Sequence, residues 1–489
     1  MKSIAVTRTK HRLRPDARRV LARPYSPGEE ILADGSSRAG LLMARVLSIP
    51  ESEVGGLLAG LLATFSQRHG GYPDILVRHF DLVAHHVPPD VRLSPERRLL
   101  IGAYFTCEYS VEAAALFNPS IVASPDQTGL GAGELRFLMS LRAVGEGHLS
   151  SIEFRSGVID GKGEMSFDAP GPLLVSGSRT SPLHYRKRLF RAKLAELGAA
   201  NELATSVLNR LSEEFGLAAL EESLAELEKH SPPHAIWFET VKIIRVLASS
   251  NYVTTFPADS AISERVIFPA GPNETRGMED ARFVRFTGTD GAVNYYATYT
   301  AYDGFQIVPQ LIATEDFATF TIATLNGTAA QNKGMALFPR PVDGNFVMLS
   351  RADRENLHVA FSDNVHFWND ATVICRPSRA WELLHMGNCG SPLETEAGWL
   401  VLTHGVGPMR RYAIGAMLLD LKDPCRVIGH LEEPLLVPDE SEREGYVPNV
   451  LYTCGGLIAR DTLFIPYGFS DTGIGVATVS LPNLLTALV

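Results

Sequence analysis

The sequence predicts a mainly β fold: a five-bladed β-propeller with added helices. Three observations lead to this prediction: one β-hairpin unit that occurs five times, a regular spacing of its last four copies, and two helical blocks outside them. Each unit has an apolar strand that ends in a polar or charged residue, a short turn and a second apolar strand. Repeats of this kind are typical of propeller blades. An irregular β-sandwich is the alternative fold for the same strands.

Residues 1–110 are predicted to form a helical N-terminal extension. The stretches SRAGLLMARVLSI, VGGLLAGLLATFSQRH and ERRLLIGAYFTCEYSVEAAALF place apolar residues at helical spacing. The arginines at the extreme N-terminus are expected to face solvent. A second block, 181–247, has helix-forming composition and mixed charge, so it is predicted to be a helical insertion with a solvated face.

Residues 111–180 are predicted to form the first blade and residues 248–489 the remaining four. The first hairpin is ELRFLMSLRAVGEG followed by LSSIEFRS, and the others start at about 291, 344, 398 and 461. Their spacing of roughly 50–60 residues suits a blade of four strands. The longer interval after the first hairpin is mostly filled by the helical insertion.

Composition limits the possible partners and location. The formal net charge of −10 argues against nonspecific binding to nucleic acid or to an anionic membrane. No run of about 18 apolar residues suggests a membrane span, and the basic, polar start lacks the apolar core of a signal peptide. A cytoplasmic protein is therefore expected. Five cysteines without a CxxC pair make a disulfide framework or a structural zinc site unexpected.

The polar residues that end the first strand of each unit are predicted to meet in one axial pocket. Equivalent positions of a radial repeat converge on the central channel of a propeller, where ligands bind. These residues are Arg142, Tyr302 with Asp303, Arg351, His404 and Asp471.

A dense group of charges, GPNETRGMEDARFVRF, precedes another apolar strand. Gly277 permits a tight backbone turn there, and Asp280 lies one step from a strand that should run toward the channel. A solvated loop is the alternative interpretation.

Four basic residues, Lys333, Arg351, His385 and His404, would form an anion site for phosphate or a carboxylate if they converge. Taken singly, a lysine and an arginine here are more often surface charges, and a single histidine is usually structural. No carboxylate stands at metal-ligand spacing from the histidines, so no metal site is predicted.

Several motifs occur together in a fixed order: FNPSIV, GMEDARFV, KGMALFPR with LSR, GSPLETEAGWLVLTHGV, YAIGAMLLDLKDP, GYVPNVLYTCGGLI and YGFSDTGIGVA. On these motifs the chain resembles glycoside hydrolase family 130, the β-mannoside phosphorylases and related β-mannosidases. The resemblance covers about 110–180 and 250–489. It implies a five-bladed β-propeller, which agrees with the repeat count.

The resemblance also implies roles for particular residues. Asp280 matches the family's catalytic acid, which acts on the glycosidic oxygen through a hydroxyl of the bound mannose. The positions that match phosphate-binding residues are Lys333, Arg351, His385, His404 and Tyr412. Asn118, Arg142 and Asp471 resemble mannose-binding residues, and Asp303 joins them as a substrate-binding candidate from the repeat pattern.

The sequence departs from the family pattern at three of these motifs. His385 stands where phosphorylases usually carry a lysine, EDAR replaces the common EDPR, and Thr403 replaces a tyrosine. The helices at 1–110 and 180–247 are not part of the common family core. The first departure leaves phosphate use open, and the helices leave substrate and oligomeric state open.

The leading functional prediction is an inverting phosphorylase that cleaves a β-mannoside oligosaccharide and yields mannose 1-phosphate. Inorganic phosphate is the co-substrate, no cofactor is expected, and Asp280 is expected to have a raised pKa as general acid. A homo-oligomer is expected from the resemblance.

Two other functions remain open. An inverting β-mannosidase would need a second carboxylate as base, for which the candidates are Glu153, Glu274, Glu279 and Glu394. A carbohydrate-binding propeller without catalysis is the third possibility.

Overall fold

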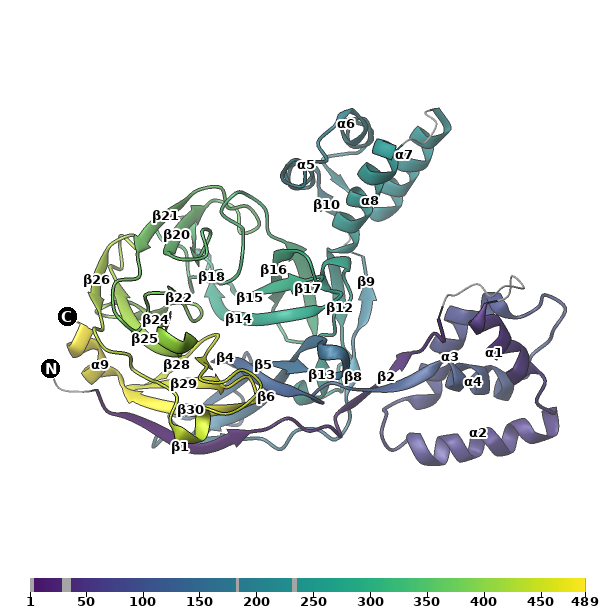
Figure 1. The fold of residues 1–489 in the computed structure, drawn as a ribbon, viewed down its shortest axis with the longest axis horizontal. Coiled ribbons are helices and arrows are strands. Elements are labelled where there is room, and N and C mark those ends of the chain that lie inside the picture. The colour runs from purple at the N-terminus through teal and green to yellow at the C-terminus, as the bar shows by residue number, and fades with distance from the viewer. Residues whose placement is uncertain (1–3, 29–36, 182–183, 231–234, 489) are drawn as a thin grey trace.

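The computed structural model describes residues 4–28, 37–181, 184–230 and 235–488. Strands dominate these residues, and two groups of helices project from one edge of the β structure (Figure 1). The protein is therefore mainly β, as the sequence predicts.

Apart from three short two-stranded pairs, the described strands form five antiparallel groups, and each of the five predicted hairpins lies within one group. The first group is β4 (Ala115–Ala123), β5 (Leu135–Val144), β6 (Ser150–Ile159) and β7 (Met165–Phe167). The second is β14 (Gly277–Thr287), β15 (Val293–Tyr302), β16 (Ile307–Thr314) and β17 (Thr319–Thr324), extended by β12 (Tyr252–Thr255) and β9 (Ser178–Thr180). The third is β18 (Ala336–Leu337), β19 (Phe346–Ser350), β20 (Leu357–Ser362) and β21 (Ala371–Cys375). The fourth is β22 (His385–Asn388), β23 (Leu393–Thr395), β24 (Gly398–Val406), β25 (Tyr412–Leu419) and β26 (Val427–His430). The fifth is β27 (Leu451–Tyr452), β28 (Leu457–Ala459), β29 (Thr462–Phe469), β30 (Gly473–Ser480) and β1 (Val6–Leu13).

Contacts between the groups run around a closed circuit. Strand β4 lies against β14, β15 against β18, β19 against β22, β25 against β27, and β29 returns to β4. The first two groups are also joined by one parallel pairing, Gly277 with Ser150. The strands consequently surround a common centre (Figure 1).

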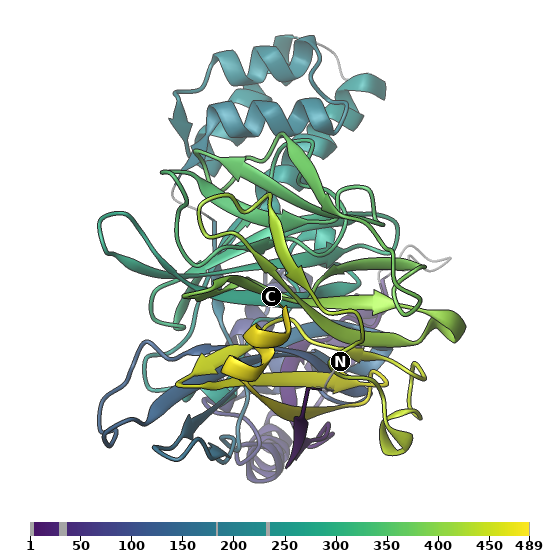
Figure 2. The same cartoon turned by 90° about the vertical axis from the view of Figure 1, so that its left-hand side faces the viewer.

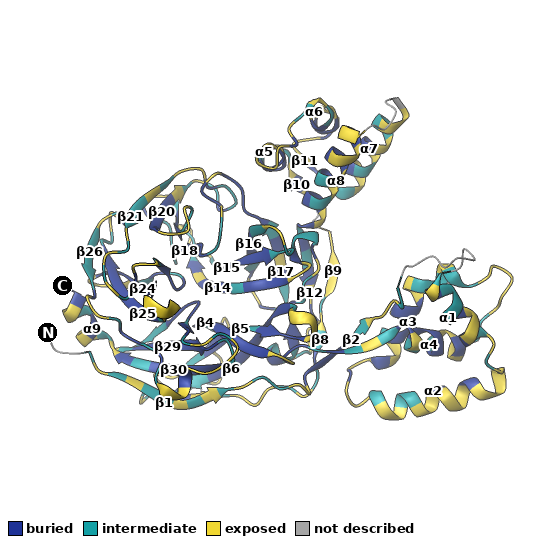
Figure 3. Cartoon of the chain, viewed as in Figure 1, coloured by how far each residue is buried: buried dark blue, intermediate teal, exposed yellow. Residues whose placement is uncertain are grey.

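The hydrophobic core lies between neighbouring groups of strands. Phe154 and Phe283 belong to the core between the first and second groups, and Met348 packs with Phe286 between the second and third. Trp399 and Val347 share the next core segment. Buried strands of the ring appear dark blue in Figure 3. Each side chain of this size stabilises the fold by about 1.5–3 kcal/mol when fully buried, so every contact between groups has its own hydrophobic stabilisation.

The predicted helical start of the chain is wrong for residues 6–24. Residues Val6–Leu13 form β1, which pairs antiparallel with β30, and β2 (Val20–Pro24) pairs with β3 (Thr106–Ser110). Successive side chains of VTRTKHRL point to opposite faces, as in any β-strand, and the segment pairs with the free edge of β30. Both β1 and the C-terminal helix α9 (Leu481–Leu488) lie beside β30 (Figure 2).

Two of the N-terminal arginines differ from the prediction that they face solvent, whereas Arg12, Arg14 and Arg18 are exposed as predicted. Arg8 donates to the buried carboxylate of Glu442 at 3.0 Å, and the side chain of Arg19 is only 7% exposed. The first strand therefore binds the β structure through ion pairs as well as backbone hydrogen bonds.

Four helices follow β2: α1 (Arg38–Leu47), α2 (Glu51–Phe65), α3 (Tyr72–Val83) and α4 (Pro95–Tyr104). The third predicted helix ends too late, because the chain turns at Phe105 and enters β3 and β4. The alanines of VEAAALF favour a helix, but pairing of β4 with β5 overrides this local preference. Among the described residues no single helix is long and apolar enough to span a bilayer, although α1 and α2 together, bent by 110°, have that length and composition.

The second helical unit is α5 (Lys187–Glu196), α6 (Glu202–Asn209), α7 (Leu217–His230) and α8 (Ala235–Ser249), with the short pair β10 (Tyr185–Arg186) and β11 (Glu214–Phe215). It lies within the predicted insertion 181–247 apart from its last two residues; residues 182–183 and 231–234 fall outside the described chain. Just before it, β8 (Val175–Ser176) pairs with β13 (Arg265–Val266). Because β9 pairs with β12 of the second group, the end of segment 111–180 does not belong to the first group as predicted.

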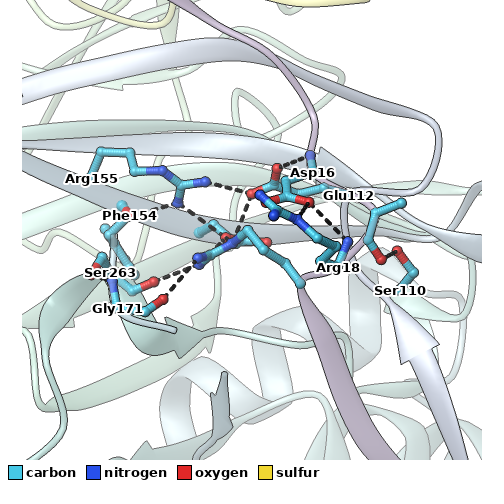
Figure 4. Close-up of polar contacts among 11 residues, drawn as sticks. Asp16, Arg18, Ser110, Glu112, Phe154, Arg155, Gly171 and Ser263 are labelled. Atoms are coloured by element: carbon cyan, nitrogen blue, oxygen red, sulfur yellow. Dashed lines mark hydrogen bonds and ion pairs between the residues drawn. The ribbon is translucent and has the colours of Figure 1, made fainter. Parts of the chain in front are cut away.

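A buried ion network fixes the segment between β1 and β2 to the first group of strands. Arg19 donates to Glu153 at 2.7 Å and lies 3.0 Å from Glu112, and Arg155 contacts both carboxylates. Arg19 also donates to the backbone oxygen of Ser263 at 2.6 Å. Figure 4 shows the contacts around Glu112 and Arg155. Two buried carboxylates thus depend on two arginines for their charge balance.

We predict that Arg19→Met destabilises the protein by roughly 3–5 kcal/mol, because it leaves two buried carboxylates with a single cation. Chemical denaturation at neutral pH measures this change. Arg18→Met is the matched control, since the Arg18 side chain is 87% exposed and pairs only with Asp16; its effect should stay within about 1 kcal/mol. Equal effects of the two substitutions would contradict a structural role for the network.

Candidate functional site

Side chains from all five groups of strands gather at one end of the ring, in two adjoining clusters. The carboxyl cluster consists of Asn118, Arg142, Glu279, Asp280, Lys333 and Asp471. The anion cluster consists of Arg282, Arg351, His385, His404, Tyr412 and Tyr452. Strand β14 belongs to both, because it carries Asp280 and Arg282.

The backbone at Asp280 turns its side chain toward the other cluster members. The pairing of β14 with β15 shifts register between Glu279 and Arg282, and Asp280 has a φ of 59°. Strand β4 has the same irregularity at Asn118, with a φ of 48°. Left-handed backbone of this kind is uncommon for residues other than glycine, although Asn and Asp adopt it most readily. The two bulges bring the Asn118 amide to 2.7 Å from the Asp280 carboxylate, to which it donates.

Arg142 and Lys333 balance the charge of the carboxylates. The Arg142 guanidinium donates to Asp280 at 3.2 Å and to Glu279 at 2.8 Å. The ammonium group of Lys333 pairs with the other oxygen of Glu279. Lys333, which the resemblance assigns to phosphate, is therefore bound to a carboxylate in this structure.

The predicted raised pKa of Asp280 is wrong for the ligand-free site. Burial alone would raise the pKa of this carboxyl, but Arg142 and Lys333, together with the Asn118 hydrogen bond, outweigh burial and bring the pKa below its ordinary value. Asp280 is consequently ionised at neutral pH until the charges around it change.

Asp471 has a raised pKa, in contrast to Asp280. It lies in the turn after β29 with a φ of 50°. Burial and the negative charge of Asp280 raise the pKa of Asp471 to about 6, although Arg142 opposes the increase. The pKa values of two carboxyls in one cluster are thus displaced in opposite directions, a pattern that is typical of acid–base sites.

The anion cluster contains two arginines without a carboxylate partner among the described residues: Arg282, which is buried, and Arg351, which is half-buried. Arg282 is 3% exposed and donates to the Tyr452 hydroxyl, while its second terminal nitrogen has no hydrogen-bond partner among the described residues. The Nε atom of Arg351 is likewise without a partner there. Neither arginine lies within 4 Å of a carboxylate in the described part of the chain. Burial of a charge is costly unless it is paired, so the cluster is suited to an anionic ligand.

The two histidines are neutral, so the arginines carry the positive charge of the anion cluster. His404 accepts a hydrogen bond from Arg351 at 2.9 Å, and burial together with this arginine holds the pKa of His404 far below its usual value. Burial and the neighbouring arginines Arg351 and Arg410 lower the pKa of His385 to about 4. Both rings are therefore neutral at pH 7 in the ligand-free site, where they contact Tyr412.

A glycine is required beside the arginine. A Cβ atom at Gly387 would lie 2.3 Å from Cδ of Arg351 and 2.8 Å from a ring carbon of His404. Strand β22 therefore passes directly against both side chains and fixes their position. A small cavity opens next to the cluster, lined among others by Asp280, Arg282 and Asn332.

Some predicted residues lie apart from both clusters. Asp303 accepts hydrogen bonds from the backbone of its own turn, Phe305 and Gln306, and has no hydrogen bond or ion pair with a cluster member in the described residues. Of the four candidate bases, only Glu279 belongs to a cluster. Glu153 is part of the buried ion network, Glu274 receives two tyrosine hydroxyls and two backbone amides, and Glu394 pairs with Arg340.

Arg282 and Tyr452 are functional candidates that the sequence did not place in the site. Arg282 belongs to the charged segment before a strand, and Tyr452 to the motif GYVPNVLYTCGGLI. The position of Arg282, two residues after Asp280, was the one indication in the sequence that it belongs to the site. The bulge in β14 that brings the two side chains to the same end of the strand is not visible in the sequence. No three His, Cys, Asp or Glu side chains in the described ranges are grouped in a way that suits a metal ion.

We predict that Asp471→Asn stabilises the protein at pH 8 by on the order of 1–2 kcal/mol. Since the folded-state pKa of Asp471, about 6, lies above its unfolded value, the wild type loses stability as the pH rises through 6, and the loss is absent below about pH 4. Thermal unfolding at pH 4 and pH 8 measures the difference. Asp363→Asn, at an exposed turn, is the control and should show no such pH dependence. A gain that is equal at both pH values would contradict the assigned environment of Asp471.

The family model for glycoside hydrolase family 130, described as β-1,4-mannooligosaccharide phosphorylase, matches residues 256–488. A 1,2-β-oligomannan phosphorylase from Thermoanaerobacter sp. (strain X514) is 35% identical over 232 residues, which are 44% of this chain and 74% of that protein. A β-1,4-mannooligosaccharide phosphorylase from Ruminococcus albus is 30% identical over 204 residues, 39% of this chain and 60% of that protein.

Among solved structures, β-1,2-mannobiose phosphorylase from Listeria innocua, in complex with β-1,2-mannobiose, aligns with a TM-score of 0.44 at 21% identity. The alignment covers 78% of this chain and 93% of that chain. The sequence match to the Thermoanaerobacter protein, which extends over nearly three quarters of that enzyme, establishes the family. The chain belongs to glycoside hydrolase family 130.

Proposed function

We propose that this protein is an inverting phosphorylase that cleaves a β-mannoside with inorganic phosphate and releases mannose 1-phosphate. The observation that carries the proposal is the pair of arginines, buried Arg282 and half-buried Arg351, which have no carboxylate partner among the described residues. Both side chains lie against Gly334, and Arg282 is two residues from Asp280 on β14. A phosphate dianion would supply the missing negative charge. The relatives support the same reaction, since both of those named above are phosphorylases of β-linked mannosides.

In the proposed reaction, an oxygen of phosphate attacks the anomeric carbon from the face opposite the leaving group. The bond between this carbon and phosphate forms as the glycosidic bond breaks, and the departing oxygen receives the proton of Asp280, relayed by a sugar hydroxyl. Phosphate brings its own negative charge, so no protein base has to generate a nucleophile. Arg282 and Arg351 would hold phosphate in line and offset the loss of its hydration.

The acid must be protonated at the moment of bond cleavage, whereas Asp280 in the ligand-free site has a lowered pKa. A bound phosphate dianion adds negative charge, and a bound sugar displaces water. Both changes favour the protonated carboxyl. Substrate binding itself would therefore prepare Asp280 as the acid.

We further propose that the five groups of strands are the blades of a five-bladed propeller. The closed circuit of contacts and the core between successive groups support this arrangement. Phosphate, Asp280 and the arginines together account for nucleophile, proton and charge, so the proposed reaction needs no metal or organic cofactor.

The first test is product release from β-1,2- and β-1,4-mannosides with and without inorganic phosphate. We expect mannose 1-phosphate to form only when phosphate is present, because phosphate is the proposed nucleophile. Anion-exchange chromatography separates this product from free mannose. Free mannose at a rate independent of phosphate would identify a hydrolase and overturn the proposal.

The second test is Asp280→Asn, which removes the proton donor while keeping the size of the side chain and the left-handed backbone. We expect a loss of turnover of roughly 10²–10⁴-fold, the usual contribution of a general acid, with phosphate binding by calorimetry retained. Asp363→Asn changes the same functional group at an exposed turn and should keep wild-type turnover. Turnover above about a tenth of wild type in Asp280→Asn would exclude this residue as the acid.

A further inference from the structure

We infer that Arg410, on the turn between β24 and β25, is an outer phosphate-binding residue that draws the anion from solution into the anion cluster. This inference rests on the proposed phosphorylase function. It concerns a residue outside the motifs by which the chain resembles its family, and it assigns a path of entry to the site.

The turn that carries Arg410 has an unusual backbone. Residues Pro408–Arg410 form one short 3₁₀ turn in which Met409 and Arg410 have φ values of 58° and 54°. Two consecutive non-glycine residues in the left-handed region cost free energy, and they persist only where the surrounding structure holds them. The Arg410 guanidinium consequently lies 5.8 Å from the centre of the Tyr412 ring.

Arg410 is the outermost member of a line of contacts that leads to Arg351 in the anion cluster. The Tyr412 ring stacks on His404 with centres 6.2 Å apart and an angle of 13° between the ring planes, and His404 accepts the hydrogen bond from Arg351. The line therefore joins exposed Arg410 to half-buried Arg351 through the rings of Tyr412 and His404.

Arg410 is also available for a ligand. It is exposed, and it makes no ion pair or side-chain hydrogen bond with any other residue in the part of the chain that the structure describes. Arg282, by contrast, is almost completely buried and cannot meet phosphate before it enters. An exposed arginine without an ion pair, next to the anion cluster, is suited to bind phosphate first.

The charges around the mouth explain why such a cation is needed. The protein has a net charge of −10, and the carboxylates Glu279, Asp280 and Asp471 lie beside the anion cluster. All of them repel a phosphate dianion. The charge of Arg410 acts to lower the pKa of both Asp471 and His385, so it lies near a member of each cluster. At physiological salt such interactions extend over about 8 Å.

The test compares Arg410→Ala with Arg411→Ala, its neighbour in sequence, which is also exposed and has no ion pair among the described residues. Both variants lose one positive charge from the same turn, so a difference between them reports position rather than net charge. For Arg410→Ala we expect kcat/KM for phosphate to fall roughly 10–100-fold, the loss of one charge-assisted contact, with KM for the mannoside changed less than twofold. Arg410→Lys should recover part of the loss, and raising the salt concentration should reduce the difference between wild type and Arg410→Ala.

Calorimetric titration of the ligand-free variants with inorganic phosphate provides a readout that does not depend on turnover. Weaker phosphate binding in Arg410→Ala than in Arg411→Ala supports the inference. Equal binding and equal kcat/KM for phosphate in the two variants would overturn it. If the wild type binds phosphate in an Arg410-dependent manner but forms no mannose 1-phosphate, the proposed function fails and the assignment of Arg410 to an anion stands.

Discussion

The site depends on one constraint: the five groups of strands must pack against one another in a closed circuit. Asn118, Asp280 and Asp471 lie far apart in the sequence, and the contacts of β4 with β14 and with β29 bring their strands together. Each contact in the circuit has an apolar core, so a loss of packing at any of them would also displace residues of the site. The buried ion network at Arg19 holds the segment that leads away from β1.

The two clusters at the centre of this ring differ in whether their charges are balanced. In the carboxyl cluster, Arg142 and Lys333 compensate the acidic groups, which keeps Asp280 ionised at neutral pH. In the anion cluster, the positive charge of Arg282 and Arg351 has no such compensation within the described residues. Asp280 and Arg282 are two residues apart on β14, and the charge of Arg282 lowers the pKa of Asp280. A ligand that brings negative charge to the anion cluster therefore also changes the protonation of the carboxyl cluster.

The differences between the sequence predictions and the structure have a common physical origin. The helical pattern of 96–117 was correct only as far as Tyr104, because β4 finds a partner in β5 that local propensity does not reveal. Strand β1 was missed because its partner lies more than 460 residues away. The four candidate bases looked alike in the sequence, yet three of them already have structural partners in the fold. Long-range pairing decided each of these cases.

The sequence by itself determined the mainly β class, the five hairpins and most of the residues of the two clusters, because strand patterns and motif order are local features. It also identified Asp280 as the central carboxyl. Only the tertiary structure decided that Asp303 lies in its own turn, that Arg282 and Tyr452 join the anion cluster, and that Asp471 rather than Asp280 has the raised pKa. Charge balance and desolvation depend on which side chains meet, and distant strands bring those side chains together.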